Sequence, residues 1–404
     1  MIKPQTLKGF RDFLPKEAQK RQYVISILKK VFASYGFEPL ETPALEYEEV
    51  LLGKYGEEGD KLMYRFEDNG KRKVALRYDQ TVPLSRVVAQ YQNELSMPFK
   101  RYQIQPVWRA ENTQKGRFRE FLQCDADIVG TNSPLSDAEV IAVAAKSVEA
   151  LGFTKYKILV NDRSVFQGIS KGAIITIDKL KKIDRKGVIA ELIDKGEVKD
   201  AAQGASILAR IESIDKPQRI NEIFSTLEKL GIESQKYEFS PTLARGLDYY
   251  TGLIFEIEID GYTAGSVCGG GRYDALIGTF ARKDIPAVGF AFGFDRLIEA
   301  MEELQLFPTD LQTTKVLVTV FSPELLEKSV EISSRLRSNT INTEIYLDEN
   351  AKMEKQLKYA DQKGIPYVVI IGPEEVEKNM VTLKNMKTRE QKQVSVEKLS
   401  SEII

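Results

Sequence analysis

Hydrophobic residues recur at helical spacing near the start of the chain, and this spacing predicts an amphipathic helix over residues 19–35. An extended stretch follows at residues 37–43, and then a hairpin whose turn is Asp68-Asn69-Gly70. Residues 100–109 and 117–129 read as two longer strands. Because strands and helices mix here without regular alternation, the pattern predicts a mainly antiparallel sheet backed by helices.

The residue composition and the hydrophobic pattern change at two further points along the chain. Residues 163–239 are rich in Lys, Asp and Glu with a weaker apolar stripe, which favours an inserted helical domain. The main domain then comprises residues 1–162 and 240–308. After a polar linker, residues 315–404 begin with β-α-β-α-β order, which predicts a separate α/β domain with a largely parallel sheet. The expected fold class is therefore α+β with an added α/β domain.

Composition narrows the class of protein. A chain of 404 residues exceeds one ordinary core, and 58 basic residues nearly balance 59 acidic ones, so nucleic acid can only be bound by local patches. Cys124 and Cys268 are too far apart for a cysteine zinc motif, and a reducing compartment fits them. The amino terminus has no apolar stretch of signal-peptide length, and no run approaches the roughly 20 apolar residues that a membrane helix needs, so we expect a cytoplasmic protein with no membrane contact.

The chain contains no histidine. Catalytic triads built on histidine, imidazole general bases and His-ligated metals are all excluded as a result. Arginine, lysine, carboxylates, tyrosine and Mg²⁺ are the groups left to do chemistry. We expect no metal held by protein His or Cys.

Positive charge is concentrated in residues 99–119, which hold six basic residues and one acidic residue, Glu111. Arg109 lies near the end of one predicted strand, with Arg117 and Arg119 across the loop. Such a hairpin could direct several guanidinium groups at a polyphosphate. Composition alone is equally consistent with a solvated basic hairpin.

A second candidate is the segment LARGLDYYTG at residues 243–252. In an extended chain Arg245 and Tyr249 share a face, whereas a bend at Gly246 would bring Tyr250 to that face instead. The spacing leaves both arrangements open. The simpler alternative is a pair of aromatic core residues beside a surface arginine.

Two glycine-containing segments follow. Residues 268–274 (CGGGRYD) carry three successive glycines, which suit close approach to a ligand or a neighbouring strand but match neither a Walker loop nor a dinucleotide-binding fingerprint. Residues 289–297 (GFAFGFDRL) read as a strand entering a helix. Arg296 falls in the first helical turn, where a cation opposes the helix dipole, and this placement favours a ligand role.

Together and in this order, these segments resemble the histidyl-tRNA synthetases, a class II synthetase family, along the whole chain. The resemblance includes GFRDFLP at residues 9–15, motif 1 around Pro43, motif 2 from Arg109 to Arg119, and motif 3 from Gly289 to Arg296. The LARGLDYYTG and GGGRYD segments resemble the two blocks particular to histidyl enzymes.

The resemblance implies ATP-dependent ligation of L-histidine to tRNA-His through a histidyl-adenylate, with Mg²⁺ on the ATP phosphates. It also implies a cytoplasmic homodimer with a C-terminal anticodon-binding domain. Residues 315–404 hold 14 basic and 14 acidic residues, so anticodon recognition would need a local patch. A rival interpretation is a non-catalytic, histidine-binding regulatory subunit of ATP phosphoribosyltransferase. Arg245 and the complete C-terminal domain argue against it.

The resemblance assigns roles residue by residue. The catalytic residues would be Arg109 and Arg245. ATP would be bound by Arg109, Glu111, Arg117, Phe121 and Arg296. Histidine would be bound by Asp79, Thr81, Gln123, Asp127, Arg245, Tyr249, Tyr250 and Tyr273.

Overall fold

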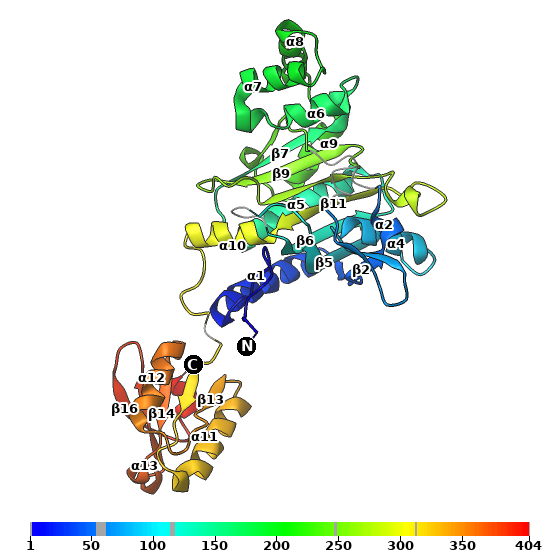
Figure 1. Ribbon diagram of the computed structural model, residues 1–404. Helices are drawn as coiled ribbons and strands as arrows, with labels where there is room; N and C mark the ends of the chain where they lie inside the picture. The colour runs from blue at the N-terminus through cyan, green and yellow to red at the C-terminus, as the bar shows by residue number, and fades with distance from the viewer. Residues whose placement is uncertain (1, 54–61, 114–117, 246–248, 312, 404) are drawn as a thin grey trace. The chain divides into compact units, whose positions relative to one another are not determined.

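The computed structural model describes residues 2–53, 62–113, 118–245, 249–311 and 313–403. The chain divides into two compact units. One unit comprises Met1–Phe13 and Arg21–Phe307, and the other comprises Leu14–Lys20 and Pro308–Ile404. Figure 1 shows the order of their helices and strands.

An eight-stranded sheet forms the centre of the larger unit (Figure 1). All pairings between its inner strands are antiparallel, and only the two outermost pairings are parallel, which confirms the predicted sheet type. In spatial order its strands are β1 (Glu38–Pro39), β5 (Phe99–Trp108), β6 (Glu120–Val129), β11 (Ala287–Gly293), β10 (Cys268–Arg272), β9 (Leu253–Ile259), β7 (Tyr156–Asp162) and β8 (Tyr237–Phe239).

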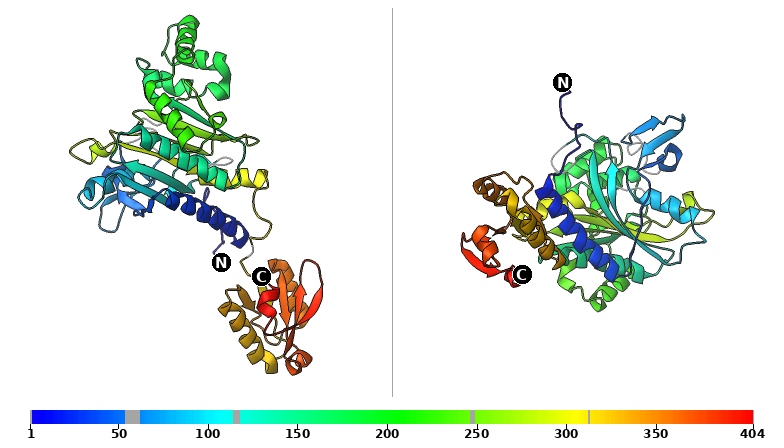
Figure 2. Two further views of the ribbon diagram at one scale, coloured as in Figure 1. Left: turned by 180° about the vertical axis from the view of Figure 1, so that it is seen from behind. Right: turned by 90° about the horizontal axis from the view of Figure 1, so that it is seen from below.

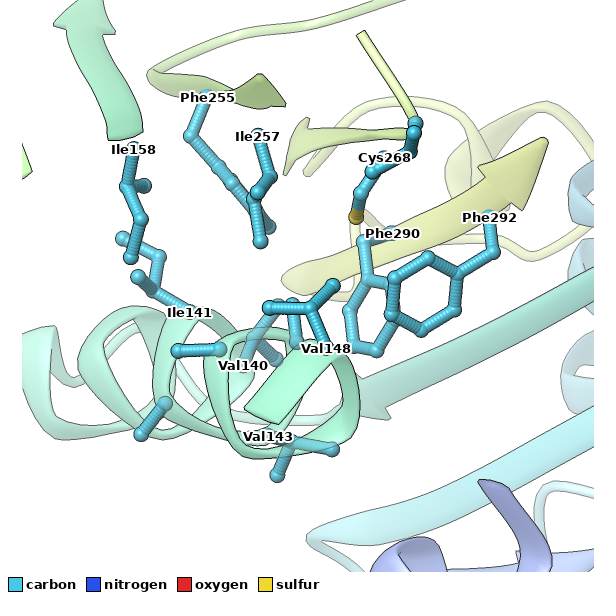
Figure 3. Close-up of a cluster of buried hydrophobic side chains, with 14 of the residues drawn as sticks. Val140, Ile141, Val143, Val148, Ile158, Phe255, Ile257, Cys268, Phe290 and Phe292 are labelled. Atoms are coloured by element: carbon cyan, nitrogen blue, oxygen red, sulfur yellow. The ribbon is translucent and has the colours of Figure 1, made fainter. Parts of the chain in front are cut away.

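One face of this sheet is covered by helices, seen from behind in Figure 2. They are α1 (Pro15–Ser34), α5 (Pro134–Ala150), α9 (Gln218–Lys229) and α10 (Phe294–Glu303). Figure 3 shows valine and isoleucine side chains of α5 meeting aromatic side chains of β9 and β11, including Phe255, Phe290 and Phe292. Burying this apolar layer fixes which sheet face is left for polar side chains.

A separate three-stranded sheet is formed by strands from the first quarter of the chain. Its strands are β2 (Leu45–Tyr47), β4 (Lys73–Leu76) and β3 (Arg65–Glu67), accompanied by α2 (Glu48–Leu51) and α4 (Thr81–Gln90). The predicted hairpin is present, but the positive φ falls on Lys71 and not on the Asn-Gly pair. The Asp68 carboxylate accepts bonds from the backbone N–H groups of Gly70 and Arg72, and so sets the turn.

The stretch predicted to be an inserted helical domain, residues 163–239, is mostly helical. Its elements are η1 (Arg163–Phe166), α6 (Lys171–Ile177), α7 (Leu180–Asp194), α8 (Ala201–Glu212), α9, η2 (Ser234–Lys236) and β8. Its last part belongs structurally with the main sheet, because α9 packs on α5 and β8 pairs with β7. The boundaries of an inserted domain therefore stay a prediction. A short η3 (Ile277–Thr279) lies between β10 and β11.

The smaller unit contains a five-stranded sheet with three parallel strands at one side. Its strands, in spatial order, are β13 (Thr343–Ile345), β12 (Val316–Val318), β14 (Tyr367–Ile370), β15 (Met380–Asn385) and β16 (Gln391–Ser395). The helices are η4 (Pro323–Leu325), α11 (Leu326–Ser338), α12 (Met353–Lys363), α13 (Pro373–Glu377) and η5 (Leu399–Glu402). The three strands of the predicted β-α-β-α-β order pair in parallel, as expected. The whole sheet is mixed and not largely parallel, because β15 and β16 add an antiparallel hairpin.

A buried charge network ties α5 to β10 and α9. Arg272, at 2% exposure, donates from Nε and Nη2 to Asp137 Oδ1 at 2.9 and 2.5 Å. Arg219 of α9 donates from Nε to Asp137 Oδ2 at 2.7 Å. A fully buried carboxylate is tolerated here because two guanidinium groups neutralise and hydrogen-bond it.

Replacing Asp137→Ala should cost about 3–5 kcal/mol of unfolding free energy, since it leaves the buried Arg272 guanidinium without its main partner. Urea denaturation measures this loss. The matched control is Glu139→Ala on the same helix, whose partly exposed pair with Lys100 should contribute about 1 kcal/mol or less. Equal losses in the two variants would contradict the assignment.

Candidate active site

Strand register places a row of polar side chains on the uncovered face of the large sheet. Gln123, Asp125 and Asp127 alternate along β6, so they point to one face while Cys124 and Ala126 enter the core. Their partners on β11 are, in order, Gly293, Ala291 and Gly289. Small partners leave open space above this part of the sheet.

Asp127 is held by groups on both sides. Arg101 of β5, fully buried, forms an ion pair of 2.8 Å with Asp127 Oδ2, and the Tyr273 hydroxyl donates to Asp127 Oδ1. Burial raises the pKa of Asp127, while the Arg101 charge opposes the increase. A Cβ on Gly289 would lie 1.9 Å from Asp127 Oδ1, so only glycine leaves room for this carboxylate.

An inner cavity of about 220 Å³ opens above these strands. Every residue that the sequence analysis assigned to histidine lines it, together with Arg109 and Asp125. Those residues are Asp79, Thr81, Gln123, Asp127, Arg245, Tyr249, Tyr250 and Tyr273. The structure therefore brings together, in one small space, side chains from segments up to about 190 residues apart.

A larger outer cavity of about 740 Å³ adjoins the inner one, and the two share Arg109, Gln123 and Arg245 in their linings. Glu111, Phe121 and Arg296 line the outer cavity alone. All three candidate arginines, Arg109, Arg245 and Arg296, therefore face one space. Arg117, also assigned to ATP, lies outside the described residues.

Arg245 stands at the junction of the two cavities. Its Nη1 donates to Glu256 Oε1 of β9 at 2.8 Å, and its backbone has a φ of 36°. A Cβ on Gly269 would lie 1.5 Å from this Nη1, so the first glycine of the GGG run makes room for the guanidinium. Burial alone would lower the pKa of Arg245, but Tyr250 and Glu256 raise it above its usual value. The group is a fixed cation.

Arg109 follows the end of β5 and is held between aromatic rings. Its Nε donates to the Tyr78 carbonyl at 3.2 Å, and its guanidinium lies 4.4 Å from the Tyr78 ring centroid and 5.1 Å from that of Phe121. Stacking fixes the plane of the guanidinium, whose Nη1 also lies 4.0 Å from Glu111 Oε1.

Arg296 lies in the first turn of α10, as predicted. Its Nη1 donates to the Ser266 carbonyl at 2.9 Å, and its side chain passes Gly265 and Gly293 on the way to the outer cavity. The loop before β10 therefore holds this arginine against the unfavourable helix dipole.

Both tyrosines named in the two arrangements for LARGLDYYTG line the inner cavity with Arg245, so neither replaces the other. Tyr249 and Tyr250 line the inner cavity together, with ring centroids 4.8 Å apart. The ring centroid of Tyr273 lies 5.9 Å from that of Tyr249, in an edge-to-face arrangement. The described part of this segment forms no strand, so alternation does not apply, and residues 246–248 lie outside the described residues. Burial raises the pKa of all three phenols, so they act as neutral hydrogen-bonding groups at neutral pH.

Sequence reasoning missed several residues of the site. Arg101 was counted only as positive charge, and Asp125 was not singled out, although alternation along predicted strands would have placed both beside the assigned residues. It also gave the GFRDFLP segment no role. Arg11 lies over the Phe118 ring at 3.2 Å and binds Asp295 at 2.8 Å, so this segment supports the rim of the outer cavity.

Comparisons with known proteins agree with this geometry. Residues 9–297 match the family model of histidyl-tRNA synthetase, and residues 315–404 match that of an anticodon-binding domain. The chain is similar to the histidine–tRNA ligases of Cytophaga hutchinsonii (38% identity, all of both chains) and Christiangramia forsetii (39%, 98% of each). It resembles the crystal structure of histidyl-tRNA synthetase from Nostoc sp. with 32% identity, covering 100% of this chain and 99% of that one, at a TM-score of 0.87. The chain belongs to the histidyl-tRNA synthetase family.

Proposed function

We propose that the protein ligates L-histidine to tRNA-His in two steps through a histidyl-adenylate. The observation that carries this proposal is the pair of adjoining cavities with Arg109 and Arg245 at their junction. The inner cavity suits a small amino acid, and the outer one has the volume of a nucleotide site. The reacting carboxylate and phosphate would meet where the two arginines stand.

Histidine would enter the inner cavity with its ring toward Asp127. This carboxylate is oriented by Arg101 and Tyr273, and Tyr250 is the second proposed partner of the ring. A buried acceptor and a buried hydroxyl reject isosteres that leave them unpaired. Asp79, Thr81 and Gln123 would receive the α-amino group, with Tyr249 beside them.

Adenylate formation needs no general base, because the attacking carboxylate is already ionised. Its oxygen would attack the α-phosphorus of ATP, and pyrophosphate would leave. Arg109 and Arg245 would stabilise the charge that gathers on the phosphoryl oxygens. Because Glu256 and the Tyr78 carbonyl hold these two guanidinium groups before substrate arrives, little reorganisation is needed during the reaction.

ATP would lie in the outer cavity. Phe121 would stack on adenine with Glu111 bonding nearby, while Arg296 and Arg117 would hold the nucleotide from the far side of the phosphates. The phosphates bring most of the negative charge, and planar guanidinium donors suit them.

The outer cavity also fits Mg²⁺ brought in on the phosphates. No group of three or more His, Cys, Asp or Glu side chains within the described part of the chain could hold a metal ion alone. Glu256 and Glu258 supply carboxylate oxygens at the cavity wall, and Mg²⁺ commonly takes one or two carboxylates together with phosphates and waters. When bound, the ion would neutralise phosphate charge.

In the second step a terminal ribose hydroxyl of tRNA-His would attack the carbonyl carbon of the adenylate, and AMP would leave. The motif 2 loop, residues 112–116, would approach the acceptor end, although residues 114–116 lie outside the described residues. The smaller unit would bind the anticodon. Its balanced charge means that base contacts, rather than a broad basic field, would provide specificity.

The rival function, a histidine-binding regulatory subunit of ATP phosphoribosyltransferase, would need the inner cavity alone. A protein with that function has no use for Arg109, Arg245 and Arg296 around a second, larger cavity, nor for a domain that matches the anticodon-binding model. The ligase accounts for both features.

A homodimer is part of the proposal. The three-stranded sheet exposes an apolar row in which Tyr47 and Phe66 both pair with Val74, and Leu45 lies on the same face. Tyr47 is 52% exposed and Phe66 is 47% exposed. Exposed aromatic residues gathered on one sheet face are typical of a protein interface. A second copy of the chain is the expected partner, in agreement with the role of motif 1.

We also propose a cytoplasmic location. Cys124 and Cys268 are both buried and free, which suits a reducing compartment. Across the residues that the structure describes, no helix combines the length and hydrophobicity needed to cross a bilayer.

Arg245→Ala should lower histidine-dependent exchange of pyrophosphate into ATP by about 100-fold to 1,000-fold, because a charged donor to the transition state is lost. The exchange assay and a thermal unfolding curve are measured together. Arg210→Ala, an exposed arginine of α8, is the matched control and should leave exchange unchanged. Normal exchange by a folded Arg245→Ala protein would rule out the assigned role.

Replacing Tyr47→Asp together with Phe66→Asp should convert the dimer into monomers, because each charge would have to be buried in an apolar interface. Sedimentation equilibrium gives the mass. Phe321→Asp, at an exposed aromatic of the smaller unit, is the control for a surface charge change. A dimer that survives the double substitution would place the interface elsewhere.

A further inference from the structure

Four residues that line the inner cavity carry a buried polar atom with no hydrogen-bond partner among the described residues. One of these atoms is Asp127 Oδ2, which is ion-paired with Arg101. The other three are Gln123 Oε1, Asp125 Oδ1 and Arg245 Nε. A buried polar atom left unpaired costs free energy, so such atoms usually mark the place of a ligand. Two acceptors and one donor complement the ammonium and carboxylate groups of an amino acid. Asp125 is the member of this set with no assigned role.

The position of Asp125 along β6 is informative. Gln123 lines both cavities, whereas Asp125 and Asp127 line the inner one only. Side chains two residues apart on a strand are separated by roughly 6.6 Å. Asp125 therefore lies between the junction where Arg245 would hold the substrate carboxylate and the deep end where Asp127 would hold the ring. Histidine bound along the line from Arg245 to Asp127 would place its α-carbon and its amino group closest to Asp125.

Charge around the cavity supports the same placement. Burial raises the pKa of Asp125 well above its usual range, Arg101 opposes this, and Asp127 and Asp79 add to it. Arg101 is already paired with Asp127 at 2.8 Å, and Asp79 Oδ1 accepts from the Val82 N–H of α4 at 3.2 Å. Three carboxylates thus share a buried space. Arg101, which opposes the rise in the pKa of Asp125 most strongly, is committed to Asp127, and Arg109 opposes it less. A cation between the carboxylates would relieve their repulsion.

We propose that Asp125 is the main charge partner of the substrate's α-ammonium group and thereby selects α-amino acids over their deaminated analogues. This inference rests on the proposed function, because it places histidine in the inner cavity. Asp79, Thr81 and Gln123 then surround the same ammonium group with further acceptors, while Asp125 Oδ1 is an acceptor that no group of the described residues hydrogen-bonds.

The test compares L-histidine with 3-(imidazol-4-yl)propionate, which keeps the ring and carboxylate but lacks the amino group. In Asp125→Asn, binding of L-histidine by calorimetry and its KM in pyrophosphate exchange should weaken by about 10-fold to 100-fold, the loss expected for a hydrogen bond to a charged group. Binding of the propionate should change by less than about 3-fold, as should the KM for ATP. The isosteric amide keeps the shape of the side chain, so kcat should fall less than the histidine affinity.

Cys124→Ala is the matched control, because it alters the next residue of β6 on the opposite, core face and should leave both affinities unchanged. If Asp125→Asn fails to fold, Asp125→Ser provides the same comparison.

Unchanged histidine affinity would overturn the proposal. Equal weakening of histidine and the propionate would also overturn it, since Asp125 would then serve the ring. Wild-type protein lacking histidine-dependent exchange, by contrast, would contradict the proposed function itself.

Discussion

The site depends on the antiparallel register of β5, β6, β11 and β10. This register sends alternate side chains of β6 to opposite faces, so an apolar layer packs on the helices while Gln123, Asp125 and Asp127 line a cavity. A shift of one residue would bury the carboxylates in the core and expose Cys124 and Ala126. The hydrophobic core and the site therefore depend on the same strand register. The face of β6 that packs against α5 is apolar, so the carboxylate side chains must lie on the opposite face.

Small residues on the neighbouring strands complete the arrangement. Gly289 leaves room for Asp127, and Gly269 leaves room for the Arg245 guanidinium. Bulky side chains at either position would occupy the space that the functional groups need. Within the glycine run of β10, a Cβ on Gly270 would lie 2.3 Å from the Gly289 carbonyl oxygen and one on Gly271 would lie 2.4 Å from the Leu253 carbonyl oxygen. The close approach of neighbouring strands that the sequence allowed is therefore present, and Gly269 in addition makes room for Arg245.

Positive charge in this site is fixed before any substrate binds. Glu256 orients Arg245, the Tyr78 and Phe121 rings orient Arg109, and the Ser266 carbonyl holds Arg296. Charges held in this way can stabilise a phosphoryl transition state with little reorganisation. Under the proposed function, a chain without histidine would catalyse adenylate formation by the placement of its arginines, since a carboxylate nucleophile needs no base.

The sequence by itself determined the sheet type of the larger unit and the segments that form the site, because hydrophobic periodicity is encoded within short windows. Alternation along the strands can place Arg101 and Asp125 on the face of the site, but it could not supply the pairing of Arg101 with Asp127, the joint presence of Tyr249 and Tyr250 in one cavity, or the antiparallel hairpin that ends the smaller sheet. Each of these depends on which strands become neighbours and in what register. Only tertiary structure decides that, since pairing energies arise between residues far apart in the chain.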